Sequence, residues 1–316
     1  MGNMRIGIGE WWASGAAVAF AAGNVLTRVA AVEGDPLAGT VIRVIPLAAF
    51  GLVMMALRQE SVVQLLPRRA EFVGWRILGL IVIYGIVIAP LAHVWLFLAF
   101  RYGGILVAVP LFSTFPLLGA LLAVPFLGER FNRRIAAGII FTSIGITVLT
   151  YGQHVGEPVS AQWQLGALYG LLTGLVWAIS SNVGSYLLRR GTSIFTLIGI
   201  TISMSALVLT LILAVDTRLA AFGSFSASAY WLLLLSGLFL GVAQYCLFKA
   251  FQLTSIASAS TVKVLDIVVA SAVAVLWLGE TMNVPIAVGI LLIVGGIVVV
   301  QLVKAANPQP APQRND

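Results

Sequence analysis

Long uninterrupted apolar segments are the feature that most restricts the fold of this chain. Residues 77–92, 105–127 and 284–303 contain almost no polar positions. At a rise of about 1.5 Å per residue, a helix needs about 20 apolar residues to cross the hydrocarbon core of a bilayer. Charged residues make up only 9% of the 316, against roughly 25% in a soluble domain. The sequence therefore predicts an all-helical membrane protein.

The same length rule, applied along the whole chain, predicts ten transmembrane helices. The shortest connections are Gly103-Gly104, between the third and fourth spans, and residues 252–254, between the eighth and ninth. Neither pair can be one helix, because about 50 residues are far too many for a single crossing. We expect no cleaved signal segment, because the first span is followed by others. The expected spans are 11–28, 37–57, 74–98, 103–127, 133–151, 166–187, 193–215, 229–251, 254–278 and 284–303.

The basic residues indicate the orientation. With the N-terminus in the cytoplasm, thirteen Arg and Lys residues lie on the cytoplasmic side, against Arg28, Arg101 and Arg218 on the other. Because cytoplasmic loops are enriched in Arg and Lys, we expect both termini in the cytoplasm of a bacterium and the chain in its inner membrane. Residues 305–316 are predicted to be a disordered tail. The net charge of +7 is spread over short loops, which excludes a nucleic-acid interface.

The second half of the chain repeats features of the first. A shift of 151 residues aligns the last three spans of each half, and a shift of about 158 aligns Asn24 with Asn182. The aligned segments are Phe100–Ile105 with Phe251–Ile256, Leu127–Glu129 with Leu278–Glu280, Gly138-Ile139 with Gly289-Ile290, and Gly145-Ile146 with Gly296-Ile297. Five spans per copy is an odd number, so the copies insert in opposite orientation. We expect inverted repeats at 1–152 and 153–304, an architecture typical of alternating-access transporters.

Short motifs at matching places in the two copies resemble those of a known family. They are Ala99-Phe100-Arg101-Tyr102, Pro116 and Gly128-Glu129-Arg130 in the first copy, and Ala250-Phe251-Gln252 and Gly279-Glu280-Thr281 in the second. With Arg43 seven residues after Pro36, the pattern resembles the EamA-type drug/metabolite transporter superfamily over nearly the whole chain. The resemblance implies a transporter of ten helices with both termini in the cytoplasm. It implies no particular substrate.

The ninth span departs from that pattern and carries two charges. Ile267 stands where the family has a proline, and Lys263 and Asp266 stand where the fourth span has Phe112 and Phe115. Ionisable groups inside a bilayer cost roughly 2.5–3.5 kcal/mol on insertion scales, which makes them candidates for function. Three residues apart, the two side chains share a helix face. We expect them to face a central cavity; the alternative is an ion pair that merely tolerates burial.

Further candidate substrate-binding residues lie in other spans. Arg43 either reaches the interface or faces inward to bind a carboxylate or phosphate. His93, which the repeat pairs with Gln244, is either a packing residue or a proton relay. Asn24 and Asn182 occupy matching places, where hydrogen bonds between helices are as reasonable a role as substrate contact. Trp177 is a candidate wall of the cavity.

Several other motifs have structural interpretations. Glycines at four-residue spacing favour close packing of helices within the chain, with homodimerisation as the second use. They are Gly166, Gly170 and Gly174, and Gly237 and Gly241. Glu129 and Glu280 are predicted caps or loop anchors, and Pro110 and Pro116 should kink the fourth span.

These patterns favour a secondary transporter of a small polar metabolite. Arg43, Lys263 and a protonated His93 outweigh Asp266, so we expect an anionic or zwitterionic substrate, such as an amino acid. Asp266 or His93 is a candidate for coupling transport to protons. The first alternative is export of organic cations or drugs, bound by Asp266 with Trp95 or Trp177.

The other function classes have less support. A membrane assembly subunit would need neither the repeat nor the buried charges, and a lipid-modifying enzyme would need a catalytic cluster that the sequence lacks. The one cysteine, Cys246, and two distant histidines, His93 and His154, exclude a multi-thiolate metal site. Without a phosphate-binding loop, we expect no cofactor, and the partners are the substrate, the bilayer and a coupling proton.

Overall fold

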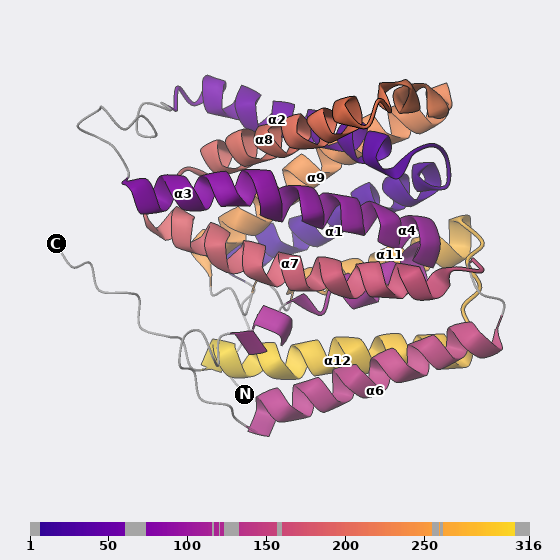
Figure 1. The fold of residues 1–316 in the computed structure, drawn as a ribbon. Helices are drawn as coiled ribbons and strands as arrows, with labels where there is room; N and C mark the ends of the chain where they lie inside the picture. Colours follow the sequence, from indigo (N-terminus) through magenta and orange to yellow (C-terminus); the bar gives the residue numbers. More distant parts are fainter. Residues whose placement is uncertain are drawn as a thin grey trace.

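The structure, a computed structural model, describes residues 7–60, 74–115, 117–119, 121–122, 133–156, 160–254, 259 and 262–306. Within these ranges the chain forms helices and no strand (Figure 1). The elements are α1 (Ile8–Ala31), α2 (Pro36–Leu57), α3 (Trp75–Ile83), η2 (Tyr84–Ile88), α4 (Ala89–Phe112), α6 (Arg133–Val155), α7 (Trp163–Arg189), α8 (Ile194–Val215), η3 (Leu219–Ser224), α9 (Ala227–Leu253), α11 (Leu265–Trp277) and α12 (Val284–Ala306).

Six described helical segments are long and apolar enough to cross a membrane, and two shorter apolar segments accompany them. The long ones are Pro36–Leu57, Trp75–Phe112, Ala136–Val155, Trp163–Arg189, Ile194–Val215 and Ala227–Leu253; the shorter ones are Leu265–Trp277 and Val284–Val299. An all-helical protein with several membrane-spanning helices is therefore confirmed. α12 continues to Ala306, two residues into the predicted tail, and 307–316 lie outside the described residues.

The break predicted at Gly103-Gly104 is present in the structure. Trp75–Phe112 is a run of 38 residues, and Gly104 within it has φ 64° and ψ −170°, a conformation that side chains with a Cβ rarely adopt. Pro110 lies inside the helix that follows, where no second non-helical residue occurs. The kink thus lies at the glycine and not at Pro110, while Pro116 is outside the described residues.

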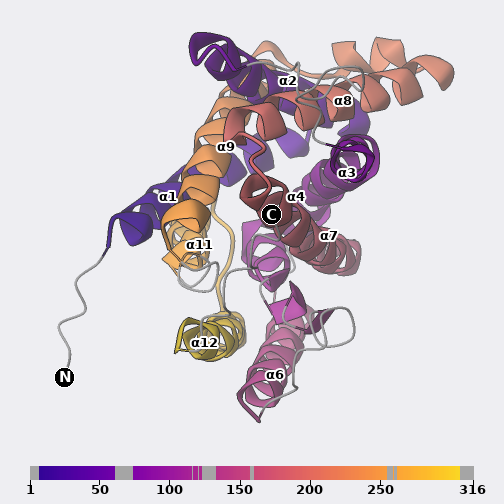
Figure 2. The ribbon, with the colours of Figure 1, turned by 90° about the vertical axis from the view of Figure 1, so that its left-hand side faces the viewer.

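Each long helix of the first half packs along one helix of the second half. The pairs are α1 with α9, α4 with α7, α2 with α8, and α6 with α12. Exchanging the two halves turns the first pair into the second and leaves the other two unchanged, as a pseudo-two-fold axis requires. Figures 1 and 2 show α2 and α8 on one side and α6 and α12 on the other, with α1, α4, α7, α9 and α11 between them.

Glycine contacts between α6 and α12 follow the same symmetry. A Cβ on Gly145 would lie 2.8 Å from the Gly289 carbonyl oxygen, and one on Gly296 would lie 2.7 Å from that of Gly138. Adding 151 to one residue of each pair and subtracting it from the other converts one contact into the other. Because only a hydrogen occupies each of these positions, the two backbones approach closely, and a larger residue would separate them.

The glycine patterns of α7 and α9 also serve packing within the chain, as predicted. A Cβ on Gly166 would lie 2.2 Å from the Gly103 backbone nitrogen, and one on Gly237 would lie 2.0 Å from the carbonyl oxygen of Arg43. Both glycines therefore join a helix of the second half to the first half. Homodimerisation stays a prediction.

Candidate functional site

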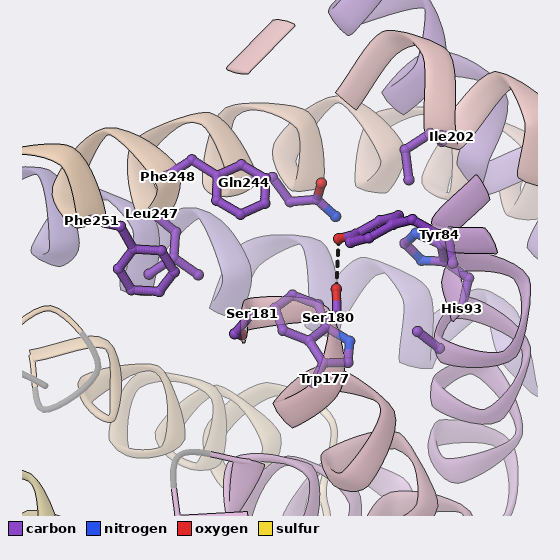
Figure 3. Close-up of a pocket in the computed structure, with 12 residues that line it drawn as sticks. Tyr84, His93, Trp177, Ser180, Ser181, Ile202, Gln244, Leu247, Phe248 and Phe251 are labelled. Carbon is purple, nitrogen blue, oxygen red and sulfur yellow. Dashed lines mark hydrogen bonds between the residues drawn. The ribbon is translucent and has the colours of Figure 1, made fainter. Parts of the chain in front are cut away.

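A pocket lies between the two halves of the chain (Figure 3). It encloses about 460 Å³ of empty space, part of it open to solvent. Its wall combines hydroxyl, amide and imidazole groups with aromatic and aliphatic side chains. The lining residues are Tyr84, Ala89, Ala92, His93, Trp177, Ser180, Ser181, Ile202, Gln244, Leu247, Phe248 and Phe251.

A π-helical turn places Tyr84 in this wall. The turn η2 joins α3 to α4 just before Pro90, which has no N–H to offer the carbonyl of Ile86, four residues earlier. A proline at this position removes a helical hydrogen bond, and π-turns inside helices are frequent at functional sites. The Tyr84 hydroxyl contacts the Ser180 hydroxyl of α7 at 2.5 Å, a bond that Figure 3 marks. A hydrogen bond thus joins the two halves within the pocket.

Arg43 of α2 holds His93 of α4 from behind the pocket. The Arg43 Nη2 atom lies 3.2 Å from His93 Nδ1 and 3.2 Å from the His93 carbonyl oxygen. A guanidinium has donors and no acceptor, so Nδ1 accepts this bond and carries no proton. The neutral ring then bears its hydrogen on Nε2. Arg43 thereby fixes His93 as a hydrogen-bond donor through its other nitrogen.

The Arg43 side chain lies in a buried polar cluster formed with α1 and α9. Its Nη1 donates to the Thr27 hydroxyl at 3.5 Å, and that hydroxyl contacts Ser236 at 2.6 Å. Asn24, one turn before Thr27, is fully buried, and neither of its amide atoms has a hydrogen-bond partner among the described residues. Arg43 itself is 0% exposed, so it does not reach the interface.

Lys263 and Asp266 form an ion pair across a turn in the ninth predicted span. The turn is at Val264, 151 residues after a turn at Ser113, so the two copies bend at matching places even though Ile267 replaces the proline. The Lys263 ammonium lies 2.8 Å from the Asp266 carboxylate, and both side chains are buried. They therefore pair with each other.

Four aromatic rings surround the Lys263 ammonium. Its Nζ lies 4.6 Å from the ring centre of Phe112, 5.2 Å from those of Phe20 and Phe115, and 6.0 Å from that of Trp177. Such cation–π contacts stabilise a desolvated ammonium by about 2 kcal/mol or more. Since Trp177 also lines the pocket, its indole stands between the pocket and the ion pair.

Five of the predicted site residues thus lie in the pocket wall or behind it. His93 and Trp177 line the pocket, with Arg43 behind the first and the ion pair behind the second. Asn24 is buried beside Thr27. Asn182 is instead exposed and donates to the carbonyl of Ala178 on its own helix, so the structure places the two matched asparagines differently.

Four polar lining residues were absent from the predicted site: Tyr84, Ser180, Ser181 and Gln244. Gln244 is the repeat equivalent of His93, 151 residues later, and both line the pocket. That correspondence could have identified Gln244 from the sequence, and the polar run at Ser180 and Ser181 could have identified the two serines. Nothing in the sequence distinguished Tyr84.

At the end of α11, Glu280 caps a helix of the other half. Its Oε2 accepts from the backbone N–H groups of Ile105 at 3.0 Å and Leu106 at 2.9 Å, directly after the break at Gly104. Arg28 of α1 binds its Oε1 at 3.2 Å. This is the capping role predicted for Glu280, while Glu129 lies outside the described residues.

Comparison with known proteins agrees with this architecture. The chain is 28% identical over 238 residues to an uncharacterized transporter of Clostridium kluyveri. The aligned part covers 73% of this chain and 74% of the relative. Its fold matches that of a protein of known crystal structure with a TM-score of 0.66 at 18% identity, over 96% of this chain and 99% of the other. The pattern of the EamA-like transporter family matches twice, at residues 7–151 and 164–302. The chain therefore belongs to the EamA-like transporter family.

Proposed function

We propose that this protein is a secondary transporter of a small polar metabolite, anionic or zwitterionic such as an amino acid, across the bacterial inner membrane. The observation that carries the proposal is the pocket between the two halves, where the repeat equivalents His93 and Gln244 both line the wall. A site shared by two related halves is what alternating access requires, because rocking the halves exposes it to each side in turn.

The proposed topology has ten helices in inverted repeats, 1–152 and 153–304, with both termini in the cytoplasm. In that orientation Ser180 and Ser181 lie in the cytoplasmic half of α7, and Gln244 to Phe251 lie in the cytoplasmic half of α9. The bonds of Glu280 to Ile105 and Arg28 lie at the opposite, outer end. The conformation is then closed outside, with a pocket that extends from His93 toward the inner side.

Coupling to protons is part of the proposal, and Asp266 is the better candidate for it. Its carboxylate lies in the bilayer behind Trp177, paired with one lysine. His93 is less suited, because Arg43 occupies its Nδ1 with a donor. A second N–H on the ring would point at that donor.

Export of organic cations is the second candidate function. The rings of Phe20, Phe112, Phe115 and Trp177 form an aromatic cage beside the Asp266 carboxylate, the arrangement that binds ammonium ligands. In this structure Lys263 already fills the cage. A cationic substrate would have to displace that side chain, so this candidate ranks second.

The proposal is tested by ligand screening followed by transport. Purified protein is heated with panels of anionic, zwitterionic and cationic metabolites, since a ligand that binds the folded state raises Tm. Solutes that stabilise it then enter a counterflow assay in liposomes. The pocket variant Ser181→Phe should abolish counterflow, and Ser143→Phe, on an exposed face of α6, should retain it. Equal counterflow in both variants would exclude this pocket as the site, and none in the wild type for any stabilising solute would refute the function.

A further inference from the structure

Arg43 is a buried cation without an acidic partner in the described part of the chain. Lys263, the other fully buried cation of the described helices, pairs with Asp266, and the half-buried Arg28 pairs with Glu280. Among the described residues, Arg43 forms hydrogen bonds with Thr27 and His93, and its Nε has no partner. A fully buried charge without a counterion is costly, so this site is incomplete without an anion.

Arg43 does not line the pocket, but its guanidinium polarises His93, which does. The guanidinium donates to Nδ1 and leaves Nε2–H as the donor of the ring, and His93 lines the pocket. A hydrogen bond from a donor that a cation polarises is stronger toward an anion than toward a neutral acceptor. Arg43 therefore acts as a positioning residue, and His93 is the group that would meet the ligand.

We propose that the neutral His93 ring, oriented and polarised by the Arg43 guanidinium, is the carboxylate-binding end of the pocket. This deepens the proposed function and rests on it. One positive charge matches one carboxylate, whereas a phosphate dianion would need more charge than the described lining offers. The remaining polar lining groups are Tyr84, Ser180, Ser181 and Gln244, and apolar side chains cover the rest. The ligand class is thus a small monocarboxylate with an apolar body, with or without an amino group.

The proposal uses the neutral form of His93, so binding of the ligand by the wild-type protein does not require a second proton on the ring. The charged or titratable groups around this ring are few in the described residues. Arg43 contacts it, Tyr84 shares the pocket, and Lys263 and Asp266 neutralise each other behind Trp177. A second proton on the ring would sit on Nδ1 and point at the guanidinium donor, so the site uses the neutral ring with its hydrogen on Nε2.

Carboxylate binding is tested with pairs of probes that differ in charge but hardly in shape. The probes are 4-methylpentanoate, benzoate and L-leucine, each compared with its carboxamide, and the readout is the Tm of the detergent-solubilised protein. At least one acid should stabilise the protein with an affinity about tenfold above that of its amide, the size expected for a charge-assisted bond. If no acid binds better than its amide in any pair, the proposal is wrong.

Variants then separate a ligand-binding role from a structural one. In Arg43→Gln the ring loses the cation that polarises it, so the affinity for the acid should fall about tenfold, to that for its amide. His93→Gln keeps an N–H donor near the Nε2 position, and His93→Asn does not. We expect His93→Gln to retain binding within about tenfold and His93→Asn to lose it.

These two histidine variants leave Arg43 in place, so they remain informative if Arg43→Gln does not fold. Acid binding by His93→Asn at wild-type strength would overturn the proposal, as would unchanged acid binding by a folded Arg43→Gln. Failure of the proposed function looks different. Acids would then bind preferentially without counterflow, whereas counterflow of uncharged or cationic solutes alone would refute only the carboxylate site.

Discussion

The Glu280 carboxylate accepts a hydrogen bond from the Ile105 backbone at 2.9 Å, so one half of the chain caps a helix of the other. The two residues are 175 positions apart. The N–H groups that Glu280 binds are those that the break at Gly104 leaves without a helical acceptor. Leu106 and Arg28 complete the arrangement. In the proposed topology these bonds hold the outer ends of the halves together.

Removing this carboxylate should destabilise the protein. Glu280→Ala leaves two buried N–H groups without an acceptor and Arg28 without its partner, and each unsatisfied buried group costs about 1–3 kcal/mol. We expect a clear drop in Tm, measured by thermal unfolding in detergent. A Tm equal to that of the wild type would show that these contacts contribute nothing.

Glu33 provides the matched control, because it also accepts from a backbone N–H, that of Ser226, but at the exposed end of α9. Hydrogen bonds from the Ser226 side chain and backbone lower the pKa of Glu33. A lowered folded-state pKa means that the stabilisation is present above the unfolded value and is lost as pH falls through the folded one. Glu33→Gln should therefore change Tm slightly at pH 7 and not at all in strong acid. An effect as large as that of Glu280→Ala would contradict this ranking.

Removing one partner of the Lys263–Asp266 ion pair should lower the stability of the protein far more than replacing both. Lys263→Met leaves a buried carboxylate unpaired, which typically costs 3–5 kcal/mol, whereas replacing both partners with apolar residues is often neutral. We expect a large loss of Tm in Lys263→Met and near recovery in the double variant Lys263→Met/Asp266→Leu. Equal losses in the two proteins would show that the charges do not depend on each other.

The double variant also tests proton coupling. If Asp266 carries the coupling proton, the folded double variant should still exchange solute in counterflow. It should lose accumulation driven by a pH gradient across the liposome membrane. Unchanged accumulation would remove Asp266 from that role.

Close packing of α9 on α2 predicts that one added methyl group disturbs the site. A Cβ at Gly237 would lie 2.0 Å from the Arg43 carbonyl oxygen, whereas one at Gly295 meets nothing within 4 Å. Gly237→Ala should lower stability by about 1–3 kcal/mol through overpacking. Gly295→Ala should be neutral or slightly stabilising, since alanine favours helix. Thermal unfolding of both variants measures the difference, and equal Tm values would contradict the packing.

Local features of this fold were predictable from the sequence. The expected spans 37–57 and 193–215 lie within a residue or so of α2 and α8, because apolar length alone decides them. The break at Gly103-Gly104 was also predicted, since glycine tolerates the left-handed φ found at Gly104. The turn at Val264 was not foreseen, because no proline or glycine marks it.

The candidate site was less accessible, since it depends on which helices meet. Lys263 and Asp266 lie three residues apart, so helix periodicity brought them together in the sequence. Arg43 and His93 are 50 residues apart on different helices, and no local pattern reports that contact. Tyr84 enters the pocket through a π-turn, whose register only the packing of α3, α4 and α8 reveals.

Alternating movement of the two halves is the central claim, and pulsed EPR distances test it most directly. In a Cys246→Ala background, one spin-label pair is placed at Val32, at the end of α1, and Met282, just after α11, which the proposed topology places outside. A second pair is placed at Leu57 and Arg190, at the ends of α2 and α7 that the proposed topology places inside. Each of these four residues is exposed, so labels should not disturb the core. With a solute that gives counterflow, the two distances should change in opposite directions. Distances that stay fixed, or that rise and fall together while the solute is transported, would contradict the account.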